Sequence, residues 1–169
     1  MQRIIGLIAA LVAAPALMAQ PTAVVNVNVV PMVTETVIRQ QTVIVDNGVI
    51  TALGPVDDIA IPEDTTVIDG TDRFLMPGLA EMHAHVPGAG SDELDRYFSL
   101  YVANGVTTVR GMLGQKSHLE LRERLLDDKV FGPRLVTSGP SFNGRSVSGV
   151  NQARQMVREQ HRVGYDFIK

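Results

Sequence analysis

Apolar and polar residues follow one rhythm up to residue 75 and a different rhythm after it. In the first part, apolar runs are short and separated by turn residues, and residues 24–30 alternate valines with Asn26 and Asn28. An alternation of period two predicts a half-buried strand. This part is therefore expected to be a small unit of strands without helices, with strands at residues 24–30, 36–45, 49–53, 66–68 and 74–76.

The sharpest predicted turn in this part is the pair Asn47-Gly48. A two-residue type I′ turn needs positive φ at both central positions, and Asn followed by Gly meets that need well. The sequence therefore predicts a hairpin that joins residues 36–45 to residues 49–53.

From Pro77 onward, strand patterns alternate with helix patterns. This alternation predicts right-handed βαβ units and a parallel sheet, as in a TIM barrel or a doubly wound open sheet. Strands are predicted at residues 79–83, 106–109, 135–137 and 165–169. The first predicted helix begins at a Ser91 cap and ends at Gly105. The second begins at a Ser117–Glu120 capping box and turns Leu121 and Leu125 inward. The third begins at Asn151 and ends at Gly164.

Two histidines, His83 and His85, stand at the end of the first of these strands. Side chains two positions apart in a strand point to the same face, so the two imidazoles could bind one ion. Neutral imidazole is a good ligand for zinc and similar divalent metals. The alternative is a pair of solvated histidines. A metal site at the carboxyl end of a parallel strand favours the TIM barrel, and no glycine-rich phosphate loop follows this strand to support the doubly wound alternative.

Composition and charge narrow the function classes. The hydrophobic fraction is 45% and the charged fraction 20%, as in ordinary globular proteins. The net charge is −3 and no basic cluster occurs, so the sequence has no electrostatic footprint for nucleic acid. Cysteine is absent, which leaves histidine, carboxylates and modified lysine as metal ligands. No feature indicates a particular oligomeric state.

Residues 1–19 have the pattern of an export signal. Arg3 precedes an apolar stretch over residues 4–14, and Ala19 offers a small residue before a cleavage site. The stretch is shorter than the about 20 apolar residues that span a bilayer. The mature protein is therefore expected to be periplasmic or secreted and not held in a membrane.

Five stretches together resemble one protein family. They are residues 44–50, 75–85, 105–110, 132–134 and 164–169. Through them the chain resembles the N-terminal part of the amidohydrolase superfamily, in its imidazolonepropionase-like and prolidase-like branch. The resemblance implies an α/β fold: the first half of a metal-dependent (β/α)8 TIM barrel with one or two divalent ions, zinc being expected. It also implies a composite β-sandwich before the barrel. Residues 20–75 would be one part of this sandwich, and residues 76–169 would begin the barrel.

The resemblance also implies roles for three further residues. Lys169 matches the position of a carboxylated lysine that bridges two metals, the alternative being an ordinary strand lysine. Glu81 stands where related chains often have Asp, and it either orients His83 or is a solvated rim residue. Arg110 is followed by Gly111, where related chains often have Asp. This difference leaves two alternatives for Arg110, which either binds substrate or has no such role. The remaining histidines, His118 and His161, are expected at the surface.

The function expected from these features is that of an exported metal-dependent amidohydrolase. It would cleave the C–N bond of an amide, peptide or cyclic amide in a small-molecule or dipeptide-like substrate. A complete barrel needs about 250 residues, whereas the chain has 169. The chain is thus expected to be the front half of a longer enzyme. The resemblance implies that the later strands of that enzyme carry two further histidine ligands and an aspartate base. The alternative is a non-catalytic truncated remnant or a fragment that requires a partner.

Overall fold

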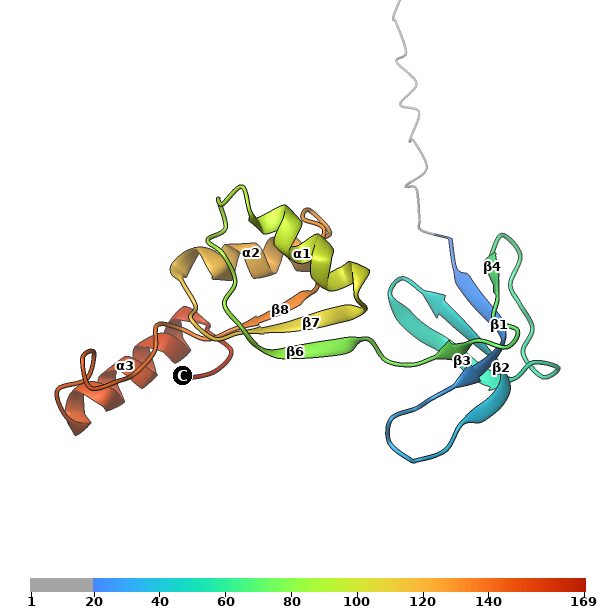
Figure 1. The fold of residues 1–169 in the computed structure, drawn as a ribbon, viewed down its shortest axis with the longest axis horizontal. Helices are drawn as coiled ribbons and strands as arrows, with labels where there is room; N and C mark the ends of the chain where they lie inside the picture. Colours follow the sequence, from blue (N-terminus) through green and yellow to red (C-terminus); the bar gives the residue numbers. More distant parts are fainter. Residues whose placement is uncertain (1–19) are drawn as a thin grey trace, which may run out of the picture. The chain divides into compact units, whose positions relative to one another are not determined.

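The computed structural model describes residues 20–169, and the predicted export signal at residues 1–19 lies outside the described residues. The chain divides into two compact units, with the boundary between Pro77 and Gly78 (Figure 1). Among the described residues, no helix is long and apolar enough to cross a membrane.

The first unit contains one mixed sheet of five strands. Strand β1 is antiparallel to β2 and parallel to β4 and β5, and β3 pairs with the other edge of β2. Each boundary lies within two residues of its expected position, which confirms the all-strand prediction. The strands are β1 (Thr22–Val29), β2 (Ile38–Asp46), β3 (Val49–Pro55), β4 (Thr66–Asp69) and β5 (Phe74–Leu75).

The predicted hairpin is confirmed. Asn47 and Gly48 have φ of 48° and 75°, and Asp46 pairs with Val49 across the turn. The core of this unit is small and consists mainly of valines. Ile50, Val67 and Phe74 are each more than half exposed, since the described residues of this unit form a single sheet. A second sheet, which a sandwich requires, is not among them.

The second unit has a parallel sheet whose strands follow chain order. Strand β7 lies between β6 and β8, and a single parallel bridge joins Ser138 to Phe167 beyond β8. This bridge is all that is present of the fourth strand expected at residues 165–169. The elements are β6 (Leu79–Ala84), α1 (Leu94–Ala103), β7 (Val106–Gly111), α2 (Lys116–Leu126), β8 (Arg134–Thr137) and α3 (Val150–Val163).

Helices α1 and α2 cover the same face of this sheet (Figure 1). Phe98 of α1 and Leu121 of α2 are fully buried against Val109 and Leu135 of the strands. Full burial of one such side chain stabilises the fold by about 1.5–3 kcal/mol. The inward orientation predicted for Leu121 and Leu125 is confirmed, because both lie in this core.

The start of α2 was predicted wrongly. The helix begins at Lys116 with Gln115 as its N-cap, not at a Ser117–Glu120 capping box. The backbone N–H of Gln115 donates to Nδ1 of His118, three residues along, at 3.3 Å. An imidazole therefore takes the part that a glutamate usually plays in a capping box. The third helix ends as predicted, with Gly164 at φ of 99°.

Candidate metal site at the carboxyl edge of the parallel sheet

His83 and His85 lie side by side at the carboxyl end of β6. Their ring centres are 5.5 Å apart, and both side chains are exposed. Ala84 between them is buried in the core under the helices, so the imidazoles leave the opposite face of the sheet. Two imidazoles that bind one tetrahedral ion at the usual nitrogen–metal distance have ring centres about 5 Å apart. The pair therefore fits a divalent metal in both chemistry and spacing.

Glu81 contacts His83 through the main chain. Its Oε1 accepts a hydrogen bond from the backbone N–H of His83 at 2.7 Å. The pairing of β6 with β7 also shifts between Glu81 and Ala84, which interrupts simple alternation in this stretch. The contact fixes the backbone that carries the first imidazole, whereas no hydrogen bond joins Glu81 to a ring of the described histidines.

Arg110 lies on β7 beside buried Val109, and its guanidinium carbon is 4.2 Å from the ring centre of Phe167. A guanidinium over an aromatic face is held by the ring's quadrupole. Because strand neighbours face opposite ways, Arg110 lies on the face away from α1 and α2. This contact joins Arg110 to the segment that ends in Lys169.

Lys169 is half-buried, and its backbone carbonyl accepts a hydrogen bond from the N–H of Phe142 at 2.6 Å. It lies two residues after Phe167, at the same carboxyl edge as the histidines. Three strand spacings of about 4.8 Å separate its strand from β6 along the sheet. Within residues 20–169, no three His, Asp or Glu side chains gather where they could hold a metal. If the histidine pair bound zinc, it would supply two of the four ligands that zinc usually takes.

His118 is buried, not at the surface as predicted, whereas His161 is exposed as expected. The Nε2 of His118 lies 3.0 Å from the carbonyl oxygen of Pro87, and the Nδ1 of His118 accepts a hydrogen bond from the backbone N–H of Gln115. These contacts fit a neutral ring with the proton on Nε2. Burial lowers the pKa of His118, and the hydrogen bond to Pro87 opposes this only in part. The prediction that His118 lies at the surface was wrong because its partner Pro87 is 31 positions away, and so distant a partner leaves no local signal in the sequence.

The stability of the second unit is expected to fall as the pH drops below 6.5, the ordinary pKa of histidine. His118 has a lower pKa when folded, so the unfolded chain binds the proton more readily between 6.5 and that lower value. The loss is at most about 1.4 kcal/mol per pH unit and stops below the folded pKa. Urea unfolding from pH 8 to 5 measures it. His118→Gln should flatten this dependence and His161→Gln should not, and an unchanged profile in His118→Gln would contradict the assignment.

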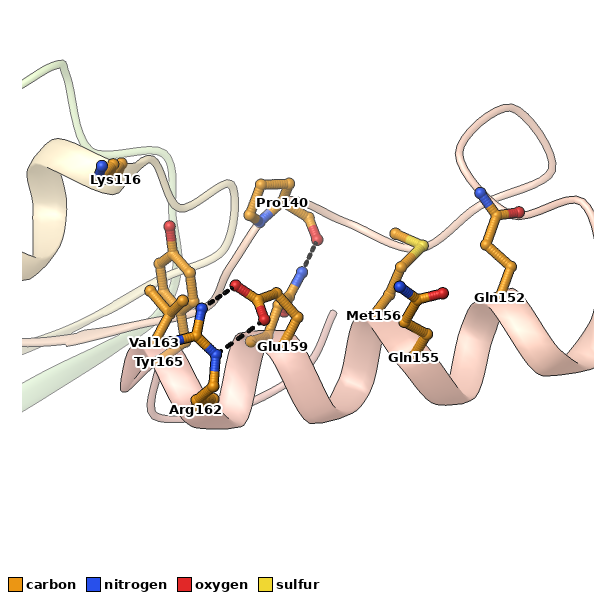
Figure 2. A pocket seen from close by; sticks show the side chains of 10 residues that line it. Lys116, Pro140, Gln152, Gln155, Met156, Glu159, Arg162, Val163 and Tyr165 are labelled. Atoms are coloured by element: carbon orange, nitrogen blue, oxygen red, sulfur yellow. Dashed lines mark hydrogen bonds and ion pairs between the residues drawn. The ribbon is translucent and has the colours of Figure 1, made fainter.

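A separate groove runs along α3 (Figure 2). It has a volume of about 640 Å³ and is lined mainly by α3 together with Lys116, Pro140 and Tyr165. In this groove Gln160 is buried, and its Nε2 donates to the carbonyl of Pro140 at 2.7 Å. The lining includes neither the histidine pair nor Lys169, so this groove is not the candidate metal site.

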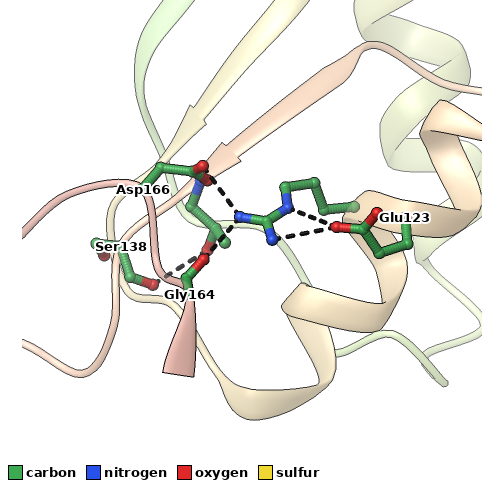
Figure 3. A network of polar contacts seen from close by, with 6 residues as sticks. Glu123, Ser138, Gly164 and Asp166 are labelled. Carbon is green, nitrogen blue, oxygen red and sulfur yellow. Dashed lines mark hydrogen bonds and ion pairs between the residues drawn. The ribbon is translucent and has the colours of Figure 1, made fainter. Parts of the chain in front are cut away.

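A polar network around Arg122 holds the segment after α3 (Figure 3). Arg122 of α2 donates to the carbonyl of Gly164 at 2.9 Å and to Asp166 Oδ1 at 3.0 Å. Burial lowers the pKa of Arg122, but the hydrogen bonds and charges of Asp166 and Glu123 outweigh burial and raise it overall. Sequence reasoning missed Arg122 and Asp166. The 44 positions between them leave no spacing signal, although Asp166 lies inside a stretch that carried the family resemblance.

Solved structures and curated sequences were compared with this chain. No family model matches the chain. A structure assigned as a prolidase from Bifidobacterium longum superposes with a TM-score of 0.73 at 25% identity, covering 89% of this chain and 40% of that one. A Xaa-Pro dipeptidase with methionine bound in its active site gives 0.67 at 20% identity, covering 88% and 46%. The chain resembles the N-terminal part of prolidase-like amidohydrolases.

Curated sequences extend the likeness to other amidohydrolases. Dihydroorotase of Mycobacterium tuberculosis is 34% identical over 72 residues, which are 41% of this chain and 16% of that protein. Dihydropyrimidinase of Arabidopsis thaliana is 37% identical over 57 residues, or 32% and 10%. The chain therefore spans less than half of each of these relatives. The relatives are amidohydrolases that act on C–N bonds, which confirms the resemblance predicted from the sequence.

Proposed function

We propose that this amidohydrolase-like chain is the N-terminal part of an exported, metal-dependent hydrolase that cleaves the peptide C–N bond of dipeptide-like substrates. The observation that carries the proposal is the exposed pair His83 and His85 at the carboxyl end of the first parallel strand. A prolidase and a Xaa-Pro dipeptidase are among the structures that cover most of the chain, which supports a dipeptide-like substrate.

The barrel belongs to the same proposal. The strands β6, β7 and β8 follow chain order, the Ser138–Phe167 bridge continues that order, and α1 and α2 cover one face. A doubly wound sheet would reverse its order at a switch point and put helices on both faces. In a TIM barrel the carboxyl edge is where catalytic residues gather, and this edge carries both the histidines and Lys169.

Each residue of the site has a proposed part in binding. His83 and His85 hold the ion, zinc being expected, through imidazole nitrogens, with Glu81 fixing the backbone of His83. Lys169, once carboxylated, supplies an anionic oxygen ligand. Arg110, stacked on Phe167, binds the carboxylate of the dipeptide. A bound metal would supply an activated water and polarise the scissile carbonyl.

The incomplete donor set within residues 20–169 favours one other candidate, a non-catalytic fragment that requires a partner. An assay separates the two. The full-length protein is incubated with Xaa-Pro dipeptides, with dihydroorotate and with dihydrouracil. We expect dipeptide cleavage that a chelator slows at least about 100-fold and that added zinc restores. Cleavage that persists after removal of metal, or cleavage of none of these substrates, would contradict the proposal.

A further inference from the structure

The segment that ends in Lys169 is fastened to its neighbours by one carboxylate. Asp166 Oδ2 accepts from the backbone N–H of Thr137 at 2.8 Å, while the N–H of Asp166 donates to the carbonyl of Thr137 at 3.0 Å. Asp166 Oδ1 accepts from Arg122, which itself reaches from α2 to the carbonyl of Gly164 (Figure 3). The carboxylate thus takes the place of a backbone acceptor beside β8 and is charge-paired there.

Arg122 and Asp166, with the contacts just described, form a clamp. This clamp determines the face of the sheet on which Lys169 lies. A shift of one residue along a strand turns every side chain to the opposite face. With Asp166 paired to Thr137, the ring of Phe167 lies under Arg110, on the face away from α1 and α2. Lys169 is two residues beyond Phe167 and shares its face in an extended segment. His83 and His85 leave the same face of β6, since Ala84 between them is in the core.

The clamp is also partly shielded from water. The side chain of Arg122 is 19% exposed and that of Asp166 33% exposed. One guanidinium joins two groups of the same segment, Gly164 and Asp166, so the chain leaving α3 is held at two points. Charge-assisted hydrogen bonds of this kind are stronger and more directional than neutral ones.

We propose that Asp166, held by Arg122, is a positioning residue that sets the register of the fourth strand and thereby presents Lys169 for carboxylation and metal binding. The inference rests on the proposed metal site at His83 and His85. It assigns a function to two residues that touch neither metal nor substrate. In metal sites, supporting residues of this kind commonly change metal affinity by about 10–100-fold when they are replaced.

The test compares Asp166→Asn with Glu159→Gln in the full-length protein. Both changes convert a carboxylate paired with an arginine into an amide, but the Glu159–Arg162 pair is exposed and lies within α3, before the segment that carries Lys169. Zinc affinity is measured by calorimetric titration. Carboxylation of lysine is measured by the carbamate signal in carbon NMR after incubation with labelled bicarbonate, with Lys169→Ala as the blank. Thermal unfolding of each variant is recorded in parallel.

We expect Asp166→Asn to lose the carbamate signal and to bind zinc about 10–100-fold more weakly, while Glu159→Gln keeps both. Arg122→Lys keeps a positive charge beside Asp166 with fewer hydrogen-bond donors, so its carbamate signal and its zinc affinity should be intermediate. This variant also provides the test if Asp166→Asn unfolds. A carbamate signal and zinc affinity within about twofold of wild type in both clamp variants would overturn the inference. If wild type binds zinc no better than His83→Ala/His85→Ala, the metal site itself fails, which is a different result.

Discussion

Replacing His83 and His85 together by alanine is expected to remove the bound metal from the full-length protein and to abolish hydrolysis. In the proposed site the pair would supply two nitrogen ligands to one ion, and the two ring centres lie 5.5 Å apart at the end of β6. Loss of two ligands from a site of four leaves too few donors to hold zinc. Elemental analysis of the purified double variant gives the metal content, and dipeptide cleavage gives the activity.

The matched control for this prediction is His161→Ala. His161 is also an exposed histidine, but it lies in the last turn of α3 and not at the end of β6. The control should keep metal and activity at the wild-type level, because its imidazole belongs to no candidate site. A double variant with unchanged metal stoichiometry would show that the pair does not bind the ion, and the proposed function would lose the observation that carries it.

The fold was largely predictable because hydrophobic periodicity is local. Alternating valines predicted the first strand of the first unit, and the Asn47-Gly48 turn predicted its hairpin. In the second unit, Leu121 and Leu125 turned inward as their spacing predicted. The one weak element is the fourth strand, where a single bridge at Phe167 replaces the predicted ladder. Here the side chain of Asp166 accepts from the backbone N–H of Thr137, in place of the backbone carbonyl that a regular ladder would use.

The candidate site was predictable only where its residues are neighbours in sequence. The pair at positions 83 and 85 can be identified from spacing alone, because period two brings both side chains to one face. By contrast, His118 was missed as a buried group because its partner is Pro87. Arg122 and Asp166 were missed for the same reason, since 44 positions separate them in the chain. Long-range polar contacts of this kind depend on the fold and leave no periodic trace in the chain.

The second large effect is expected from Lys169→Ala, which should lower dipeptide hydrolysis in the full-length protein at least about 100-fold. Carboxylated as proposed, Lys169 would supply an anionic ligand to the metal, and alanine would remove that ligand. Small carboxylic acids such as acetate, added with excess zinc, should restore part of the rate, because a free carboxylate can occupy the space left by the carbamate. The measurement is the hydrolysis rate across an acetate titration, with the metal content determined at each end.

Lys129→Ala is the control for the lysine. Lys129 pairs with Asp127 in an exposed ion pair, 66% of its side chain being exposed, so its removal should change the rate by less than about twofold. Acetate should have no effect on that variant, since it has no ligand to replace. If Lys169→Ala instead turned over near the wild-type rate with full metal loading, Lys169 would be an ordinary strand lysine. The clamp formed by Arg122 and Asp166 would then serve only to fasten the chain after α3 to β8.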